Sequence, residues 1–212
     1  MTSSDESAPP PATPWFALLT FVALAGLAAL FVTYTLLRPE PPAFEPTPPN
    51  AEAAGDTLVG PVVYTVDARN GLRWRYFDFS RGSVVEGPSD LEWDLALQRL
   101  WVIANGGLDF EGQGGIVDLG PMAYDSVQTA PASGYVGTDA RPDTINTAIS
   151  RWYDYSVLSH LLSPKPHVYV VRTADGRYAK LELLGYYCTG GEAGCMTFRY
   201  TYQGSGSRSF QR

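Results

Sequence analysis

Two histidines and two cysteines are the residues best suited to coordination or redox chemistry in this 212-residue chain. His160 and His167, its only histidines, are separated by six residues in SHLLSPKPHVYV, and six residues also separate its only cysteines, Cys188 and Cys195. Imidazole nitrogen and thiolate sulfur are ligands for metals and metal cofactors. Both gaps exceed the spacing of about two to five residues found in structural zinc sites, so a zinc site built from these four residues is a weak alternative.

The segment between the cysteines, TGGEAG, has the composition of a loop, and strand-like sequence flanks it on both sides. Two cysteines placed across the mouth of a hairpin can reach disulfide geometry. We therefore predict a Cys188–Cys195 disulfide, which implies an oxidising compartment. A pair of reduced thiols in the cytosol is the alternative.

No arrangement typical of an enzyme is present. The chain lacks GxSxG and HExxH, and Asp109 and Glu111 lie in the Gly-rich segment NGGLDFEGQGG, which has the composition of a solvated loop. That segment also lacks the strand–GxGxxG–helix context of a phosphate-binding loop. The net charge of −7 and the absence of a Lys/Arg cluster argue against nucleic-acid binding. The sequence predicts a non-enzymatic protein.

The N-terminal part divides into a tail and an apolar segment. Residues 1–14 are rich in Pro, Ser and Ala, which predicts disorder. Residues 15–37 carry no charge and, as a helix, would span about 34 Å, enough to cross a membrane. Trp15 and Tyr34 lie near its two ends, as interfacial aromatic residues do. A cleaved signal peptide is the alternative, but no Lys or Arg precedes the apolar segment.

The topology of this single-pass anchor is predicted from two opposing signals. Arg38 follows the apolar segment, which favours a cytoplasmic C-terminal domain. The predicted disulfide favours a translocated domain and outweighs one arginine. We therefore expect the bacterial cytoplasmic (inner) membrane, with the C-terminal domain in the periplasm.

The segment after the apolar helix, residues 38–57, is predicted to be a spacer. Residues 39–49 contain six prolines in PEPPAFEPTPP. This composition favours polyproline II, which would hold the following domain roughly 30 Å from the bilayer if fully extended.

The part from 58 to 203 is predicted to be an antiparallel all-β domain, followed by a flexible tail at 204–212. In MTFRYTYQ apolar and polar residues alternate, which is typical of a strand. Asp175-Gly176 and Asn70-Gly71 each lie between alternating segments, which predicts two tight hairpins. Residues 93–103 favour a strand over a short helix. Residues 121–150 show little periodicity and are predicted to be a long loop.

Several stretches of the domain resemble the HmuY-like family of bacterial haem-binding proteins. Their combination, a Trp-Asp strand, a WYxY segment, a DGRYAKL hairpin and a final FRYTY strand, is more specific than any one of them. The resemblance implies an exported, non-enzymatic, all-β protein in which two side chains from separate segments hold the haem iron. The stretches are LRWRYFDFSRGSVV (72–85), WDLALQRLWVIANGG (93–107), GIVDLG (115–120), RWYDYSVLSHLLSPKP (151–166), VYVVRTADGRYAKLELLGYY (168–187) and CMTFRYTYQ (195–203).

Under this resemblance, His160 is the first candidate for a haem ligand. If the intervening stretch were extended, His167 would lie roughly 23 Å away, too far to share an iron with it. Met122, in the predicted long loop, is a candidate for the second ligand because methionine can bind haem iron. The opposing interpretation treats both histidines as ordinary surface residues.

Two functional hypotheses follow. The first is a non-enzymatic accessory subunit of an energy-transducing inner-membrane complex, such as a photosynthetic reaction centre with its antenna or a respiratory complex. Its partners would be membrane-protein subunits, contacted by the helix and by the aromatic-rich periplasmic domain, and no cofactor would be needed. The second, implied by the resemblance, is haem binding through His160 with Met122 or His167.

Overall fold

The computed structural model describes residues 15–37, 39–50, 53–139 and 143–212. The predicted disordered tail at 1–14 lies outside these residues, as does Arg38. The apolar segment forms helix α1, Trp15–Leu36, as predicted. Its 22 residues give a length of about 33 Å, and it is the one described helix long and apolar enough to cross a membrane.

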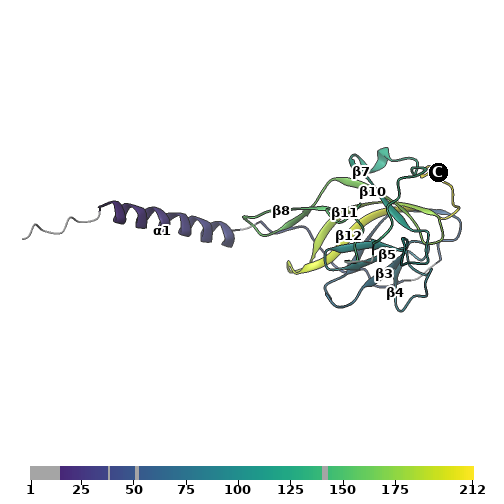
Figure 1. The fold of residues 1–212 in the computed structure, drawn as a ribbon, viewed down its shortest axis with the longest axis horizontal. Coiled ribbons are helices and arrows are strands. Elements are labelled where there is room, and N and C mark those ends of the chain that lie inside the picture. The colour runs from purple at the N-terminus through teal and green to yellow at the C-terminus, as the bar shows by residue number, and fades with distance from the viewer. Residues whose placement is uncertain (1–14, 38, 51–52, 140–142) are drawn as a thin grey trace, which may run out of the picture. The chain divides into compact units, whose positions relative to one another are not determined.

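The β domain consists of two main sheets and a separate two-stranded hairpin (Figure 1). In the larger sheet the order is β2-β12-β11-β10-β7, and the short β1 also pairs with β11. The second sheet has the order β4-β3-β5-β6, and β8 pairs with β9. The strands are β1 Ala43–Phe44, β2 Leu58–Asp67, β3 Arg75–Asp78, β4 Ser83–Val85, β5 Leu95–Gln98, β6 Trp101–Ala104, β7 Gly115–Pro121, β8 Tyr153–Tyr155, β9 Leu162–Pro164, β10 His167–Arg172, β11 Tyr178–Cys188 and β12 Ala193–Gln203.

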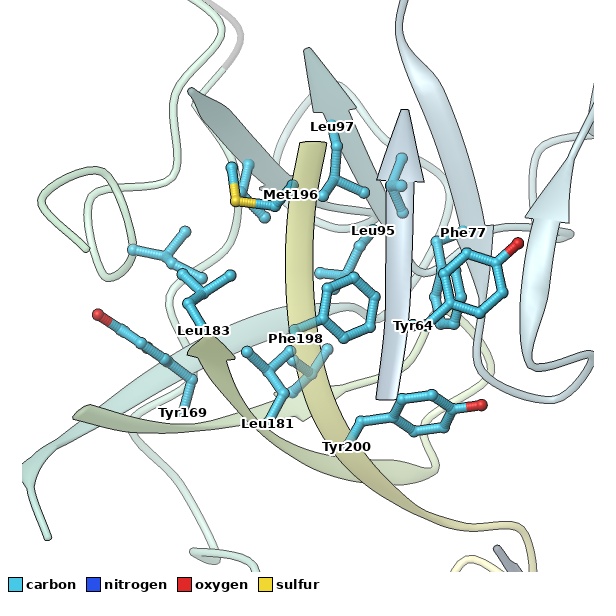
Figure 2. Close-up of a cluster of buried hydrophobic side chains, with 14 of the residues drawn as sticks. Tyr64, Phe77, Leu95, Leu97, Tyr169, Leu181, Leu183, Met196, Phe198 and Tyr200 are labelled. Atoms are coloured by element: carbon cyan, nitrogen blue, oxygen red, sulfur yellow. The ribbon is translucent and has the colours of Figure 1, made fainter. Parts of the chain in front are cut away.

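The core lies between the two main sheets. Alternate residues of β12 point into it, and their rings meet those of the smaller sheet: the Phe77 and Phe198 centroids are 5.1 Å apart with nearly perpendicular planes. Leu95 and Leu181 complete this layer from the two sides (Figure 2). The alternation predicted for β12 is therefore confirmed, and aromatic packing joins the sheets.

The outer face of β12 is also covered. Tyr124, in the short 3-10 helix Tyr124–Ser126, donates or accepts a hydrogen bond with Thr201 at 2.7 Å between the two hydroxyl oxygens. Phe210 is buried against the same layer, and Ser209 forms a bridge with Thr129. The prediction of a flexible tail at 204–212 is therefore wrong, because this segment and the long loop together cover the second face of the sheet.

The Pro-rich segment is not a free spacer over its described part. Strand β11 continues past the end of its pairing with β10, and β1 fills the open edge, with Ala43 opposite Tyr187. Further along, the Thr47 amide donates to the Thr65 carbonyl at 2.9 Å. The stand-off prediction is wrong for this stretch, because the unpaired edge of β11 offers backbone hydrogen bonds that an extended proline-rich chain can still use.

Gly185 makes room for this docked segment. A Cβ atom on Gly185 would lie 2.5 Å from a ring carbon of Phe44, so only glycine allows the Phe44 ring to lie on β11 at this point.

Of the two predicted Gly-containing hairpins, one is confirmed and one is wrong. The Asp175-Gly176 turn joins β10 to β11, with Arg172 opposite Tyr178. Asn70-Gly71, in contrast, links β2 of the large sheet to β3 of the small sheet. Each of those strands pairs with partners from elsewhere in the chain, so the turn connects two sheets.

Residues 93–103 form a tight hairpin, β5–β6, where one strand was predicted. The chain reverses at Arg99, which has a φ of 52°. The long loop prediction for 121–150 fits the described residues of that range, in which the only named element is the three-residue 3-10 helix.

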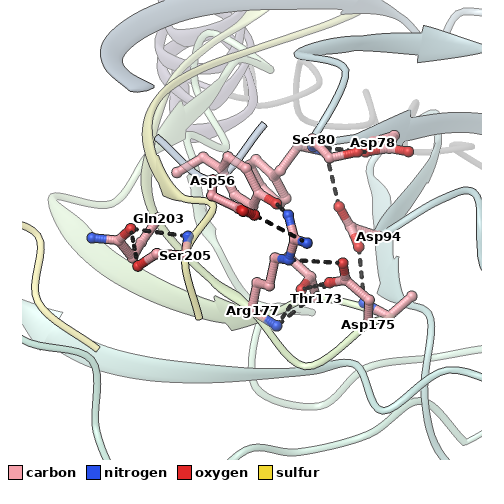
Figure 3. Close-up of polar contacts among 12 residues, drawn as sticks. Asp56, Asp78, Ser80, Asp94, Thr173, Asp175, Arg177, Gln203 and Ser205 are labelled. Carbon is pink, nitrogen blue, oxygen red and sulfur yellow. Dashed lines mark hydrogen bonds and ion pairs between the residues drawn. The ribbon is translucent and has the colours of Figure 1, made fainter. Parts of the chain in front are cut away.

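A buried carboxylate links the two sheets. One oxygen of Asp94 accepts a hydrogen bond from the Phe79 amide at 2.8 Å, and the other accepts from the Ala174 amide at 2.8 Å (Figure 3). Burial, and then the charge of Asp78, raise the pKa of this carboxyl to about 7. Asp94 thus holds the start of β5 against the β10–β11 turn.

Candidate functional site

His160 lies in the turn between the short strands β8 and β9. Its backbone has a φ of 56°, in the left-handed region that residues other than glycine seldom adopt. The His160 amide donates to the Ser156 carbonyl at 2.8 Å, and this bond closes the turn. The imidazole is exposed, and its Nδ1 is 2.6 Å from the hydroxyl oxygen of Tyr155. The turn therefore presents a histidine whose ring is oriented by a neighbouring tyrosine.

This contact favours one nitrogen for coordination. When Nδ1 donates its proton to the Tyr155 hydroxyl oxygen, the lone pair lies on Nε2. Metal-bound histidines usually have this arrangement, in which the second ring nitrogen donates to an oxygen that fixes the ring. In this tautomer Nε2 is the ring nitrogen that carries the lone pair required for coordination.

His167 is the first residue of β10, and its surroundings differ. Its Nδ1 is 2.9 Å from a carboxylate oxygen of Asp118 in β7. Because a carboxylate can only accept, Nδ1 carries the proton in this bond. His167 thus has the histidine–carboxylate pairing that orients many metal ligands.

The sheet register places Met122 one residue beyond the position opposite His167. His167 is opposite Pro121 in the β7–β10 pair, and Met122 directly follows Pro121. The Met122 side chain is 40% exposed. A thioether and an imidazole therefore lie at the same end of the sheet, although their residues are far apart in the sequence.

His160 and His167 do not form a single site in this arrangement. Strand β9 lies between them in the chain and pairs with β8, while His167 begins a strand that pairs with β7 and β11. The structure thus defines two candidate positions, one centred on His160 with Tyr155 and one on His167 with Met122. The partners Tyr155 and Asp118 were not identified from the sequence, since no spacing motif points to them.

The β8–β9 hairpin is supported by aromatic residues beneath it. The Leu162 amide donates to the Tyr187 hydroxyl at 2.8 Å, and Trp152 is fully buried against Tyr186. Above this base, Tyr155, Val157 and Leu158 are 52%, 71% and 52% exposed. The hairpin therefore has a rigid foot and an apolar tip open to its surroundings.

The cysteines form a disulfide, as predicted. Cys188 is the last residue of β11 and Cys195 is the third residue of β12, and their sulfur atoms are bonded to each other. The zinc alternative is wrong, because these sulfurs are committed to the bridge. The described residues contain no cluster of three or more His, Cys, Asp or Glu that could hold a metal ion.

Asp109 and Glu111 remain exposed, as expected for a loop, but they border a depression of about 480 Å³. Trp93 and Phe110 form one wall, with ring centroids 5.6 Å apart and nearly perpendicular. The two aromatic residues belong to a small buried cluster outside the main core.

The architecture and the two histidines define the class of protein first. It is a mostly antiparallel fold of two packed sheets that carries candidate metal-binding side chains at its periphery. The HmuY protein family matches residues 70–200 of the chain, which covers more than half of its length. The chain belongs to the HmuY family, as the sequence resemblance indicated. A search of curated proteins finds no match.

Solved structures share the fold. A putative HmuY-like haem-binding protein from Bacteroides vulgatus is 23% identical, with a TM-score of 0.53, over 66% of this chain and 91% of that one. The apo HmuY analogue of Tannerella forsythia is 17% identical, with a TM-score of 0.55, over 71% and 98%. A putative lipoprotein from Bacteroides fragilis is 19% identical, with a TM-score of 0.53, over 72% and 93%.

Proposed function

We propose that this chain is a membrane-anchored, non-enzymatic haem-binding protein of the HmuY type, with His160 as an iron ligand. The observation that carries the proposal is the exposed imidazole of His160, whose Nδ1 is held by the Tyr155 hydroxyl. Membership of the HmuY family supports the ligand class, because a similar structure is described as a haem-binding protein.

The donor set of the described residues suits haem. Histidine and methionine are both common axial ligands of haem iron, and bound haem would supply iron coordination and a large planar apolar surface. The half-exposed ring of Tyr155 lies beside His160, with the ring centroids 6.1 Å apart, and offers a surface against which a porphyrin could pack. The role of the chain's residues is to orient the ligating nitrogen and to exclude water from the ring.

We place Met122 and His167 second. Their proximity across the β7–β10 pair makes them a candidate pair for one iron, with Asp118 orienting the His167 ring. In this arrangement the His160 position would be a separate site. Single substitutions distinguish the two arrangements.

We also propose that α1 anchors the protein in the bacterial inner membrane, with the disulfide-bonded domain in the periplasm. The length and composition of α1 and the oxidised cysteines support this. Membership of a larger energy-transducing complex, with subunits contacted by α1 and by the β domain, stays a prediction, and the matched proteins do not point to it. Haem binding therefore takes first place.

Haem titration of the full chain in lipid nanodiscs tests the ligand. We expect a shifted Soret band that saturates at one haem per chain and is abolished by His160→Ala. Leu108→Ala is the matched control, because Leu108 is 99% exposed but lies outside both candidate positions. If His160→Ala leaves the shift intact while His167→Ala or Met122→Ala removes it, the site is at β7–β10. If the wild type gives no shift beyond that of empty nanodiscs, haem binding is wrong.

A further inference from the structure

The tip of the β8–β9 hairpin exposes apolar side chains that the fold does not use. Val157 is 71% exposed and Leu158 is 52% exposed, while Tyr155 adds an amphipathic ring that is half exposed. Water contact with such a group of side chains is unfavourable, and clustered exposed apolar residues mark sites of interaction with proteins or membranes.

The hairpin rises from the end of the domain at which the chain enters from α1. Ala43 of β1, the first described strand after α1, is opposite Tyr187 of β11. The same Tyr187 accepts, through its hydroxyl oxygen, the hydrogen bond from the Leu162 amide at the foot of the hairpin. One residue of β11 thus contacts both the entering chain and the hairpin.

The link between α1 and this end of the domain is short. Residues 37–42 separate Leu36, the end of α1, from Ala43, the start of β1. Even fully extended, these seven steps along the chain span at most about 25 Å. If α1 crosses a membrane, the end of the domain that carries the hairpin therefore cannot be far from the bilayer surface.

The charges of the hairpin lie below its tip. The tip segment Tyr155–Leu158 carries no charge, and the carboxylate of Asp154, the residue before it, is paired with the Lys165 ammonium at 4.0 Å. Arg151 and Lys165 lie at the foot, where the Lys165 ammonium donates to the Arg151 carbonyl at 2.8 Å. With the tip in lipid, these cations would lie about 10 Å further out, at the level of the phosphate groups.

We infer that the tip of this hairpin, Val157 and Leu158, inserts into the lipid interface and forms a second membrane contact besides α1. The occupant is the lipid itself, because the tip is uncharged and the tether keeps its end of the domain near the bilayer. The inference rests on the anchoring part of the proposed function and is independent of haem. It fixes which face of the domain meets the membrane and places His160 close to the lipid surface.

Site-specific fluorescence on the full chain tests the inference. The native disulfide leaves no free thiol, so Leu158→Cys can carry a single environment-sensitive nitrobenzoxadiazole label. The protein is reconstituted into phosphatidylcholine vesicles, which carry no net charge. Quenching by nitroxide-labelled lipid reports lipid contact, and quenching by iodide reports water contact.

Two further labels serve as controls. Ala25→Cys, in the middle of α1, reports whether the helix is inserted. Leu108→Cys is the matched exposed position at the opposite end of β11: it lies in the loop whose Gln113 amide donates to the Ala174 carbonyl, beside the β10–β11 turn.

We expect the label at 158 to behave like the label at 25, with blue-shifted emission and quenching by nitroxide lipid, while the label at 108 is quenched by iodide alone. If the label at 158 matches the one at 108 while 25 is in lipid, the inference is wrong and the anchor stands. Shielding at 158 from both quenchers means that protein covers the tip and likewise overturns lipid as the occupant. A water-exposed label at 25 overturns the anchor and this inference together.

Discussion

The core between the two sheets and the β8–β9 hairpin use the same kinds of residue in opposite ways. Phe77 and Phe198 are almost completely buried and stack edge to face. In the hairpin, Val157 and Leu158 remain exposed at the end of strands of only three residues. Exposed apolar side chains beside an exposed histidine contribute little to folding and are best explained by binding of a ligand or of lipid. The core therefore provides stability, and the hairpin provides function.

The largest difference is expected when one apolar residue is truncated in each region. Phe198→Ala should lower the free energy of unfolding by about 3–5 kcal/mol, because it removes a buried ring that contacts both sheets. Leu158→Ala should change it by less than about 0.5 kcal/mol. Urea denaturation followed by tyrosine and tryptophan fluorescence measures both. If Leu158→Ala lowered the free energy of unfolding as much as Phe198→Ala, the hairpin tip would contribute to folding and the contrast between the two regions would be wrong.

The disulfide contributes to the stability of the core strands β11 and β12. Its loop is short, with a sequence separation of seven, so the chain-entropy model gives a contribution of about 2.5 kcal/mol. We expect the free energy of unfolding of the double variant Cys188→Ser/Cys195→Ser to be lower by that amount, so that it unfolds at a lower urea concentration. The variant should retain haem binding, and a loss of haem binding without unfolding would mean that the bridge belongs to the binding region.

Asp94 links the two sheets, and its contribution to the free energy of unfolding is expected to depend on pH. The pKa of its carboxyl is raised from 3.8 to about 7 in the folded chain, so the folded state binds the proton more tightly than the unfolded state does. Stability from this group is therefore full below about pH 4 and falls as the pH rises through 7. Urea unfolding at a series of pH values should show this decline.

Asp94→Asn should remove the decline between pH 4 and 7. At low pH the variant should be less stable than the wild type by about 1–3 kcal/mol, because an amide nitrogen replaces one of the two oxygens that accept buried backbone hydrogen bonds. Leu108→Ala, which changes a 99% exposed side chain without a titratable group, is the control and should leave the pH profile unchanged. A wild-type profile that rises between pH 4 and 7 would contradict the raised pKa.

In the hairpin the expected effect is on haem affinity. Tyr155→Phe keeps the ring but removes the hydroxyl that orients His160, so the affinity for haem should fall by roughly 10- to 100-fold while stability changes little. Tyr153→Phe, two residues earlier in the same strand, serves as the control. Equal haem affinity for both variants would show that the Tyr155 hydroxyl does not act on the ligand.

Local pattern was sufficient to predict much of the fold. The alternation in β12, the Asp175-Gly176 hairpin and the uncharged helix depend on neighbouring residues, and all three are present. Pairings between distant segments were predicted poorly. The Asn70-Gly71 turn has the composition of a hairpin turn, but β2 finds its partner in β12, more than 100 residues away, and nothing local encodes that choice.

The same limit applies to the docked segments and to the site. The Pro-rich segment and the C-terminal segment were predicted to be unpacked because their own composition buries little. In the structure the first pairs with the open edge of β11, and the second packs over the outer face of β12. His160 was a candidate because of the family resemblance, and His167 and Met122 were candidates by residue type. The placement of Met122 and His167 at the same end of the sheet depends on the β7–β10 register, and the Tyr155 contact depends on the shape of one turn, so neither was predictable.

The most direct test of the account uses the fact that the chain has only two histidines. Full-length protein with nitrogen-15-labelled histidine, in nanodiscs, gives separate ring signals for His160 and His167, assigned with single His→Gln variants. Gallium protoporphyrin, a diamagnetic analogue of haem, is then added to saturation. The account predicts a large shift of the Nε2 signal of His160, while Nδ1 stays protonated. Unchanged signals of the His160 ring at saturating porphyrin would contradict it.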